Sequence, residues 1–164
     1  METNIMDMAY IAGFLDGEGC IGVVPVKNYA KNRPLTRTYW TVRITATNND
    51  KAVLEYIASV FGGRVSSHGK RPDGYRPTWR WMLDGKKVDA VLTALLPFLR
   101  TKRPQAELAL QYRATFDNER KTTLRFVHKA GRFCGVQLDE GIFQRRRKIE
   151  QQLAELNHRG RSSL

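Results

Sequence analysis

Arginine and hydroxyl side chains alternate with apolar side chains in residues 37–47 and again in residues 75–83. A period of two places alternate residues on opposite faces of a β-strand, so each segment predicts a strand with one polar and one apolar face. An arginine can bond a guanine through two hydrogen bonds, and a two-stranded ribbon fits the major groove of DNA. A solvated sheet face is the ordinary alternative, but arginine and lysine outnumber the acids on the polar face, which favours DNA.

The strand pattern predicts which side chains would contact the bases. In the first pair of strands these are Asn28, Arg37, Tyr39, Thr41, Arg43 and Thr45. In the second pair they are Ser66, His68, Lys70, Arg76, Thr78 and Arg80. Lys31 and Arg33 lie in the basic loop between the first two strands, and we expect them to bind backbone phosphates.

Net charge points to the same class of partner. The 164-residue chain has 28 Lys and Arg against 16 Asp and Glu, which gives a net charge of +12. Such a surface attracts polyanions, because neutralising phosphates releases condensed counterions. A membrane surface is disfavoured, since the charge is spread along the chain and lies beside no apolar anchor. A basic protein with no nucleic-acid role is the remaining alternative.

Composition limits the other classes of protein. Hydrophobic residues make up 41% of the chain, which is enough for a packed core and too many for a disordered chain. No apolar run reaches the roughly 18 residues that span a bilayer, and residues 1–20 lack the pattern of a secretory signal. We therefore expect a protein that stays inside a cell or organelle.

The cysteines and histidines lack the spacing of a disulfide framework or a metal site. Cys20 and Cys134 lie far apart, which is typical of two ordinary thiols in reducing, cytoplasm-like conditions. No pair among His68, His128 and His158 has zinc-ligand spacing, so we predict no zinc site.

The elements that must position these side chains form an α+β domain. The predicted order is helix, strand, strand, helix, strand, strand, helix, helix, and the apolar strand faces would pack on the helices. Strands are predicted at residues 20–28, 37–47, 64–69 and 75–83. Helices are predicted at residues 7–18, from Asn49 or Asp50 to Gly62-Gly63, around residues 88–95, and after a cap at Thr101.

The last part of the chain is predicted to be an extension. Residues 1–117 would form the core, and residues 118–164 a basic C-terminal extension with a helix at about residues 138–156. The run Arg145-Arg146-Arg147-Lys148 lies on this helix. It would either contact the flanks of bound DNA or form a solvated helix face, and the sequence favours neither.

The helix at residues 7–18 has small residues along one face. Ala9, Gly13 and Gly17 recur every four residues, while Ile11 and Leu15 belong to an apolar face. Glycine within a helix costs roughly 0.5–1 kcal/mol, so a strip of small residues makes sense where a second helix approaches closely. Chance, or the nearness of the helix end, is the alternative explanation.

Residues 11–19 read Ile-Ala-Gly-Phe-Leu-Asp-Gly-Glu-Gly, and this segment, with the preceding Ala9-Tyr10, resembles the signature of the LAGLIDADG homing endonucleases. The order of elements fits over about residues 8–116. Residues 96–102 resemble a second signature, in which a proline-containing junction brings a lysine toward the active site. The resemblance implies the αββαββα fold, whose antiparallel sheet forms a saddle on DNA with helices on its other face. One copy of the motif implies a homodimer that reads a palindromic or pseudo-palindromic site.

The resemblance also implies the site residues. Glu18 would be catalytic and would hold the metal with the carbonyl of Gly17, and Lys102 would stabilise charge in the transition state. Two motif helices would meet through Ala9, Ala12, Gly13, Asp16 and Gly17, and Asp16 would also hydrogen-bond near the helix ends. Mg²⁺ is the implied cofactor, because it prefers oxygen ligands. We expect Mn²⁺ to substitute for it, and Ca²⁺ to bind without supporting cleavage.

The implied activity is a divalent-metal-dependent double-strand break with 3′ overhangs at a long DNA site, which promotes intron mobility. A maturase that binds intron RNA and a non-cleaving DNA-binding protein are the alternatives on the same fold. Two positions depart from the dimeric relatives, because Ala46 replaces a polar glutamine and Asp50 or Lys51 lies where a basic residue is frequent. The solvent network around the site is therefore expected to differ.

Overall fold

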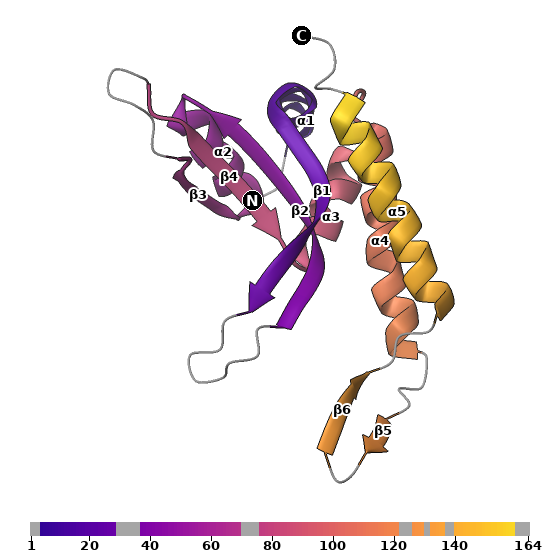
Figure 1. Cartoon of the computed structure of the whole chain (residues 1–164). Helices are drawn as coiled ribbons and strands as arrows, with labels where there is room; N and C mark the ends of the chain where they lie inside the picture. The colour runs from indigo at the N-terminus through magenta and orange to yellow at the C-terminus, as the bar shows by residue number, and fades with distance from the viewer. Residues whose placement is uncertain are drawn as a thin grey trace.

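The computed structural model describes residues 4–28, 37–69, 76–121, 126–129, 132–136 and 140–159 (Figure 1). Its elements, in chain order, are α1 (Ile5–Glu18), β1 (Gly19–Asn28), β2 (Arg37–Asn48), α2 (Lys51–Phe61), β3 (Arg64–Ser67), β4 (Trp79–Asp84), α3 (Lys87–Leu95), α4 (Arg103–Lys121), β5 (Phe126–Lys129), β6 (Arg132–Val136) and α5 (Glu140–Arg159).

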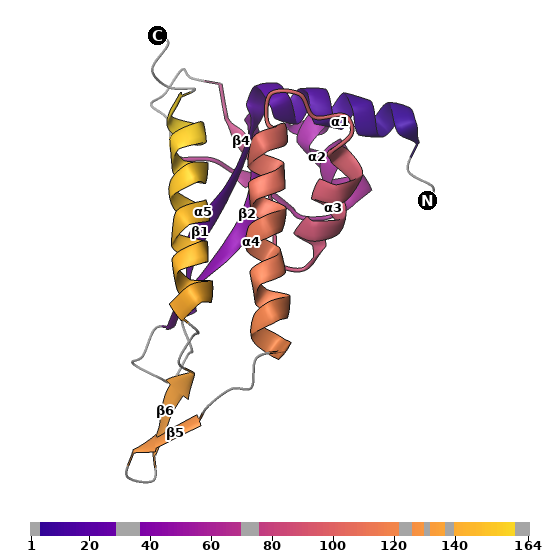
Figure 2. The ribbon, with the colours of Figure 1, turned by 90° about the vertical axis from the view of Figure 1, so that its right-hand side faces the viewer.

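The first four strands form one antiparallel sheet in the order β1-β2-β4-β3. Helices α1 to α4 contact this sheet, and Figure 2 shows them on one side of it. The α+β architecture expected from the sequence is therefore confirmed. Below, the side of the sheet that faces away from α1 to α4 is called the open face.

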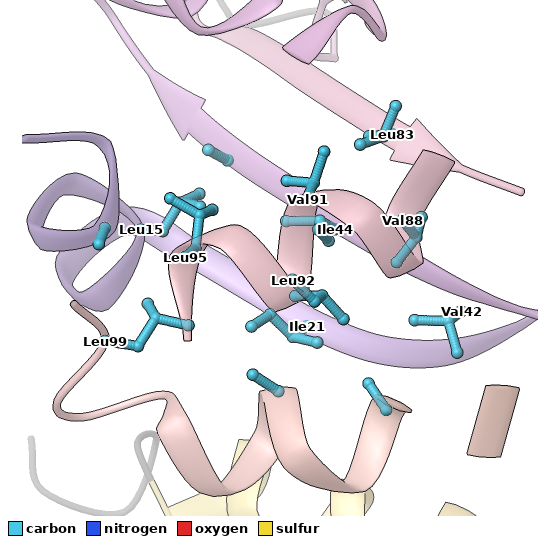
Figure 3. Packing of buried hydrophobic residues seen from close by; sticks show 14 of the residues in the cluster. Leu15, Ile21, Val42, Ile44, Leu83, Val88, Val91, Leu92, Leu95 and Leu99 are labelled. Atoms are coloured by element: carbon cyan, nitrogen blue, oxygen red, sulfur yellow. The ribbon is translucent and has the colours of Figure 1, made fainter. Parts of the chain in front are cut away.

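The covered face of the sheet is apolar because alternate residues of its strands are apolar. Ile21 of β1, Ile44 of β2 and Leu83 of β4 are buried in one cluster with Val91 and Leu92 of α3 (Figure 3). Burial of each such side chain stabilises the fold by about 1.5–3 kcal/mol. This shared core fixes the strand register, because a slip of one residue would turn the apolar side chains to the open face.

Helix α1 begins and ends at residues suited to those positions. The side chain of Asn4 accepts a hydrogen bond from the backbone N–H of Met6 over 3.2 Å, so Asn4 is the N-cap. The chain passes directly from the helix into β1 at Gly19, and a Cβ atom there would lie 2.5 Å from the carbonyl oxygen of Leu15. The last residue of the motif must therefore be glycine for this helix to continue as a strand.

Two threonines predicted for the open face are buried. Thr78 is 6% exposed and lies just before β4, where its hydroxyl donates to Oδ1 of Asn49 over 3.0 Å. Thr41 is 7% exposed and lies opposite Val24 of β1. The apolar Trp40 is exposed instead, because β2 pairs with β4 only from Arg43 onward and its hairpin with β1 extends past α1, α2 and α3 (Figure 1).

The start of α4 also differs from the prediction by one residue. The helix begins at Arg103, and the backbone N–H of Ala106 donates to the carbonyl oxygen of Lys102 over 3.0 Å. Lys102 therefore occupies the N-cap position that was predicted for Thr101.

The predicted C-terminal extension packs on the core. The boundary expected between residues 117 and 118 falls inside α4, and a two-stranded hairpin of β5 and β6 follows, which the sequence did not predict. Helix α5 contacts both α4 and β1, and its Ile149 and Leu153 belong to the buried core. At the sheet edge, Nδ2 of Asn157 donates to the carbonyl oxygen of Ile21 over 3.0 Å.

The basic run on α5 is divided between the core and the surface. Arg146 is buried: its Nε donates to the hydroxyl of Thr115 over 2.7 Å, and its guanidinium lies 4.0 Å from the ring centre of Phe116. The flanking Arg145 and Arg147 are exposed. One arginine of the run therefore serves the packing of α5 on α4.

Replacing Gly19 with alanine tests the junction between α1 and β1. The added Cβ would overlap backbone atoms of Leu15, so we expect Gly19→Ala to lower the free energy of unfolding by about 1–3 kcal/mol in urea denaturation. Gly22→Ala in the same strand is the matched control, because its Cβ would make only an ordinary contact, 3.5 Å from Nδ2 of Asn157. Equal stability of the two variants would contradict the prediction.

Candidate active site and nucleic-acid interface

The motif places an exposed acid at the carboxyl end of α1. Ile11, Ala12 and Leu15 hold the helix in the core, and Gly17 and Glu18 are exposed at its end. The last turn contains no basic residue. Because the carbonyl end of a helix carries partial negative charge, a carboxylate there is unfavourable by about 0.3–1 kcal/mol and a nearby cation is favourable. The end of α1 is thus electrostatically suited to a bound cation.

Asp16 ties the end of α1 to the segment that precedes α4. Its Oδ2 accepts the backbone N–H of Arg100 over 2.8 Å, and its Oδ1 accepts the backbone N–H of Lys102 over 2.8 Å. The ammonium of Lys102 donates in turn to the backbone carbonyl oxygen of Asp16 over 3.0 Å. The buried Leu99 anchors the same segment. This network, the Asp16–Lys102 clamp, brings the cation of Lys102 to the helix end that bears Glu18.

The outer face of α1 is apolar and uncovered. Ala9, Gly13 and Gly17 are exposed, and a Cβ atom added at either glycine would meet nothing within 4 Å in the described part of the chain. Met6 and Tyr10 on the same face are 77% and 54% exposed. A helix that is apolar on all sides is normally buried on all sides, so this face is suited to a partner.

Ala12 and Asp16, which the resemblance put in the subunit contact, differ in exposure. Ala12 is fully buried in the core of its own chain, which corrects its assignment to the contact surface. Its place in the helix follows the apolar face of Ile11 and Leu15 and not the small-residue strip. Asp16 is partly buried, and its carboxylate is engaged in the Asp16–Lys102 clamp.

Tyr56 of α2 borders the exposed face of α1. Its hydroxyl donates to Oδ1 of Asp7 over 2.6 Å, and its ring lies 6.0 Å from that of Tyr10 in an edge-on arrangement. The hydrogen bond to the Asp7 carboxylate, with the loss of hydration, raises the pKa of Tyr56 above its ordinary value. The tyrosine is thus a neutral hydroxyl that fixes α2 against α1.

The open face of the sheet is the candidate nucleic-acid interface. Arg43, Thr45, Ser66, His68 and Arg80 are partly exposed, and Arg76 is exposed, so six of the predicted side chains reach the surface. The backbones of Asn28, Arg37 and Tyr39 lie in β1 and β2, but their side chains are outside the description. Lys31, Arg33 and Lys70 fall in the segments that the structure does not describe.

Sequence reasoning missed three polar residues of this interface. Thr47 continues the alternation of β2 two residues beyond its last predicted member, and it lies opposite Arg80. Arg64 has the same parity as Ser66 in β3. Asp84 ends β4 and pairs with Arg43, with 2.8 Å between Nη2 and Oδ2. Alternation could have found the first two, whereas the third depends on strand register.

The oxygen atoms at the end of α1 suit a divalent cation that takes its remaining ligands from outside this one chain. No group of three or more His, Cys, Asp or Glu side chains in the described ranges could hold a metal ion. Glu18, with the backbone of Gly17, offers oxygen ligands, which hard cations such as Mg²⁺ bind while keeping several waters. The residues present therefore fit an oxygen-ligated ion that DNA phosphates or a second copy of the chain also ligate.

The positions where the resemblance implies a glutamine and a basic residue have structural contacts in this chain. Ala46 is buried opposite Gly19. Asp50 caps α2 by accepting the backbone N–H of Ala52 over 2.9 Å. The ammonium of Lys51 lies 2.6 Å from Glu55 and 4.8 Å from the ring centre of Trp79. These contacts give all three residues structural partners.

The described helices include none that is both long and apolar enough to cross a membrane.

Comparison with known proteins gives a matching family profile and a relative of similar sequence. The family profile described as LAGLIDADG endonuclease matches residues 11–103. DNA endonuclease I-CvuI of Chlorella vulgaris is 34% identical over 115 residues, which span 66% of each chain, just under two thirds.

Two solved structures show the same fold. I-CvuI in complex with its target in the presence of calcium has a TM-score of 0.64 at 24% identity, covering 92% of this chain and 82% of that one. The archaeal intron-encoded homing endonuclease I-Vdi141I, complexed with DNA, also has a TM-score of 0.64, at 19% identity, covering 92% of this chain and 84% of that one. The profile match over more than half of the sequence and the shared fold lead to one conclusion: this chain belongs to the LAGLIDADG endonuclease family.

Proposed function

We propose that this protein is a site-specific homing endonuclease that acts as a homodimer and makes a divalent-metal-dependent double-strand break with 3′ overhangs in DNA. The observation that carries the proposal is the exposed Glu18 at the end of α1, the same helix end to which the Asp16–Lys102 clamp holds the ammonium of Lys102. A carboxylate and an ordered cation at one helix end suit phosphodiester hydrolysis, in which negative charge develops on the phosphate and on the leaving oxygen.

The exposed face of α1 supports the homodimer. Ala9, Gly13 and Gly17 offer a smooth strip to a second copy, and isologous contact through one helix brings the two helix ends close to the symmetry axis. Each subunit then contributes one Glu18, so two carboxylates would serve the two strands of the duplex. The contact also buries Met6 and Tyr10, which the single chain leaves to water.

The chain's own groups have distinct parts in the proposed reaction. Glu18, with the carbonyl of Gly17, would hold the divalent ion. That ion supplies Lewis-acid stabilisation of phosphate charge and activates water. Lys102 would place its positive charge beside the scissile phosphate, and Asp16 would hold the backbone of that lysine. We propose Mg²⁺ as the natural ion, with Mn²⁺ substituting and Ca²⁺ supporting binding only.

The open face of the sheet would lie on DNA as a saddle. Its arginines can read base edges in the major groove, while the net charge of +12 attracts the phosphate backbone. Two subunits would double this surface and read a long pseudo-palindromic site. A break at that site would promote intron mobility. Such a protein acts wherever the host genome lies.

Replacing Glu18 with glutamine tests the metal-binding role. The amide keeps the size of the side chain but removes its charge, so we expect Glu18→Gln to bind DNA as the unchanged protein does and to cut it at least about a thousand-fold more slowly. Cleavage with Mg²⁺ and binding with Ca²⁺ are measured on DNA spanning the insertion site of the gene.

Glu140→Gln is the control, because it makes the same change at the first residue of α5, outside the candidate site. Undiminished cutting by Glu18→Gln would refute the role of Glu18. Tight binding without any cutting by the unchanged protein, in every divalent ion, would instead favour a non-cleaving DNA-binding protein. Splicing that depends on the protein would favour a maturase that binds intron RNA.

Replacing Gly13 with leucine tests the dimer contact. No atom of the described chain lies where the new side chain would begin, so the variant should fold, yet a bulky residue should keep two α1 helices apart. Sedimentation should give twice the 18.8 kDa chain mass for the unchanged protein and the single mass for Gly13→Leu. Ala114→Leu, at an exposed position of α4, is the matched control and should remain dimeric. A dimeric Gly13→Leu protein would rule out contact through this strip.

Two further variants separate the charge of Lys102 from the position of its backbone. Lys102→Met keeps the backbone N–H that bonds Asp16, so we expect slower cleavage with little change in stability. Asp16→Asn leaves one backbone donor without its acceptor, which should lower the free energy of unfolding by about 1–3 kcal/mol and also slow cleavage. Cleavage rates and urea denaturation distinguish the two effects. Cleavage by Lys102→Met at the unchanged rate would remove Lys102 from the active site.

A further inference from the structure

Two arginines of the open face are each held by an acceptor on a neighbouring strand. Arg43 of β2 donates from Nη2 to Oδ2 of Asp84 on β4 over 2.8 Å. Arg80 of β4 has its Nη2 only 2.6 Å from Nε2 of His68, the residue that follows β3. The second pair is unusual because a neutral ring takes the place of a carboxylate.

The chemistry of the two groups decides which of them donates. A guanidinium has five N–H donors and no acceptor, so Arg80 is the donor at this distance. Nε2 of His68 is then the acceptor, and the single ring proton is on Nδ1. Arg80 therefore keeps its full positive charge, whereas the charge of Arg43 is offset by Asp84.

The acceptor itself is fixed by the fold. The backbone N–H of His68 donates to the carbonyl oxygen of Thr78 over 2.7 Å, which extends the pairing of β3 with β4 by one residue. The buried hydroxyl of Thr78 is tied in turn to Asn49. A ring with two rotatable bonds on an anchored backbone is a stiff support for the long side chain of Arg80.

We propose that His68 is a positioning residue that holds Arg80 so that its other N–H groups read one guanine in each half of the DNA site. This inference rests on the proposed function, because it assumes that the open face lies on duplex DNA. One of five donors is committed to His68, and two of the others suffice for O6 and N7 of guanine. A side chain that is already ordered loses less freedom on binding, so the support strengthens the preference for that base.

The probe is a pool of random-sequence duplexes, from which the full-length protein selects binding sites in Ca²⁺. The selected consensus and its single-base variants then serve as fixed probes for Kd measurements. The variants are Arg80→Met, which removes the reader, His68→Leu, which removes the acceptor, and His68→Gln, which restores an acceptor oxygen. Thermal unfolding verifies that each variant is folded.

We expect Arg80→Met to lose about 5-fold to about 100-fold of the preference for guanine at two symmetry-related positions of the consensus. His68→Leu should weaken the preference at the same two positions, and His68→Gln should restore most of it. In the Arg80→Met background, His68→Leu should have no further effect, because His68 acts only through Arg80. A merely structural role for His68 would lower affinity at all positions equally.

The possible failures are distinguishable. If the unchanged protein selects no consensus at all, the proposed function and this inference both fall. If a consensus is selected but His68→Leu leaves the base preference intact, only the inference is overturned. The same holds if His68→Leu changes the preference in the Arg80→Met background, since His68 would then contact DNA by itself.

Discussion

The structure depends on one helix that is apolar on both of its faces. The inner face of α1 supplies Ile11 and Leu15 to the core, and its outer face exposes Met6, Tyr10 and Gly13. A helix in this situation remains partly unsatisfied in a single chain, because water meets side chains that prefer an apolar contact. In the proposed dimer the same fourteen residues of α1 join the core of each subunit to the symmetry axis.

The position of the acid follows from this constraint. Glu18 ends α1 and Gly19 begins β1, so the acid lies where the helix layer meets the sheet, and no loop intervenes between them. The Asp16–Lys102 clamp closes the other side, since it fixes a segment 84 and 86 residues further along the chain against the same helix end. A helix end thus places Glu18, and hydrogen bonds to Asp16 anchor the connection that carries Lys102, and such fixed placement favours preorganised charge stabilisation.

Periodic patterns correctly predicted features that depend on residues close in sequence. They failed where contacts between distant segments decide whether a side chain is buried. The alternation of β2 and β4 placed Ile44 and Leu83 on the apolar face, and the first helix ends at residue 18 as predicted, because periodicity acts over a few residues. The same parity placed Thr41 and Thr78 in solvent, although pairing and neighbouring segments bury them.

The candidate site shows the same division between local and long-range information. The polar parity found Arg43 and Arg80, but only the strand register reveals that Asp84 and His68 hold them. Small residues suggested a contact strip on α1, and the family resemblance added Ala12 to it, although Ala12 follows the apolar period of Ile11 and Leu15 and is buried with them. Helix α5 was expected, but its basic run gave no sign that Arg146 would be buried against Thr115 and Phe116.

Helix α5 has a consequence for how far the chain can be shortened. Strand β1 is at the edge of the sheet, and an uncovered edge presents unpaired N–H and C=O groups that recruit strands from other molecules. The side chain of Asn157 donates a hydrogen bond to the carbonyl oxygen of Ile21. Helix α5 contacts this edge strand, and its Ile149 and Leu153 are buried. A fragment cut after α4 would keep the motif and the whole four-stranded sheet but expose this border to aggregation. A minimal version for protein engineering therefore has to retain α5 or supply another cover for β1.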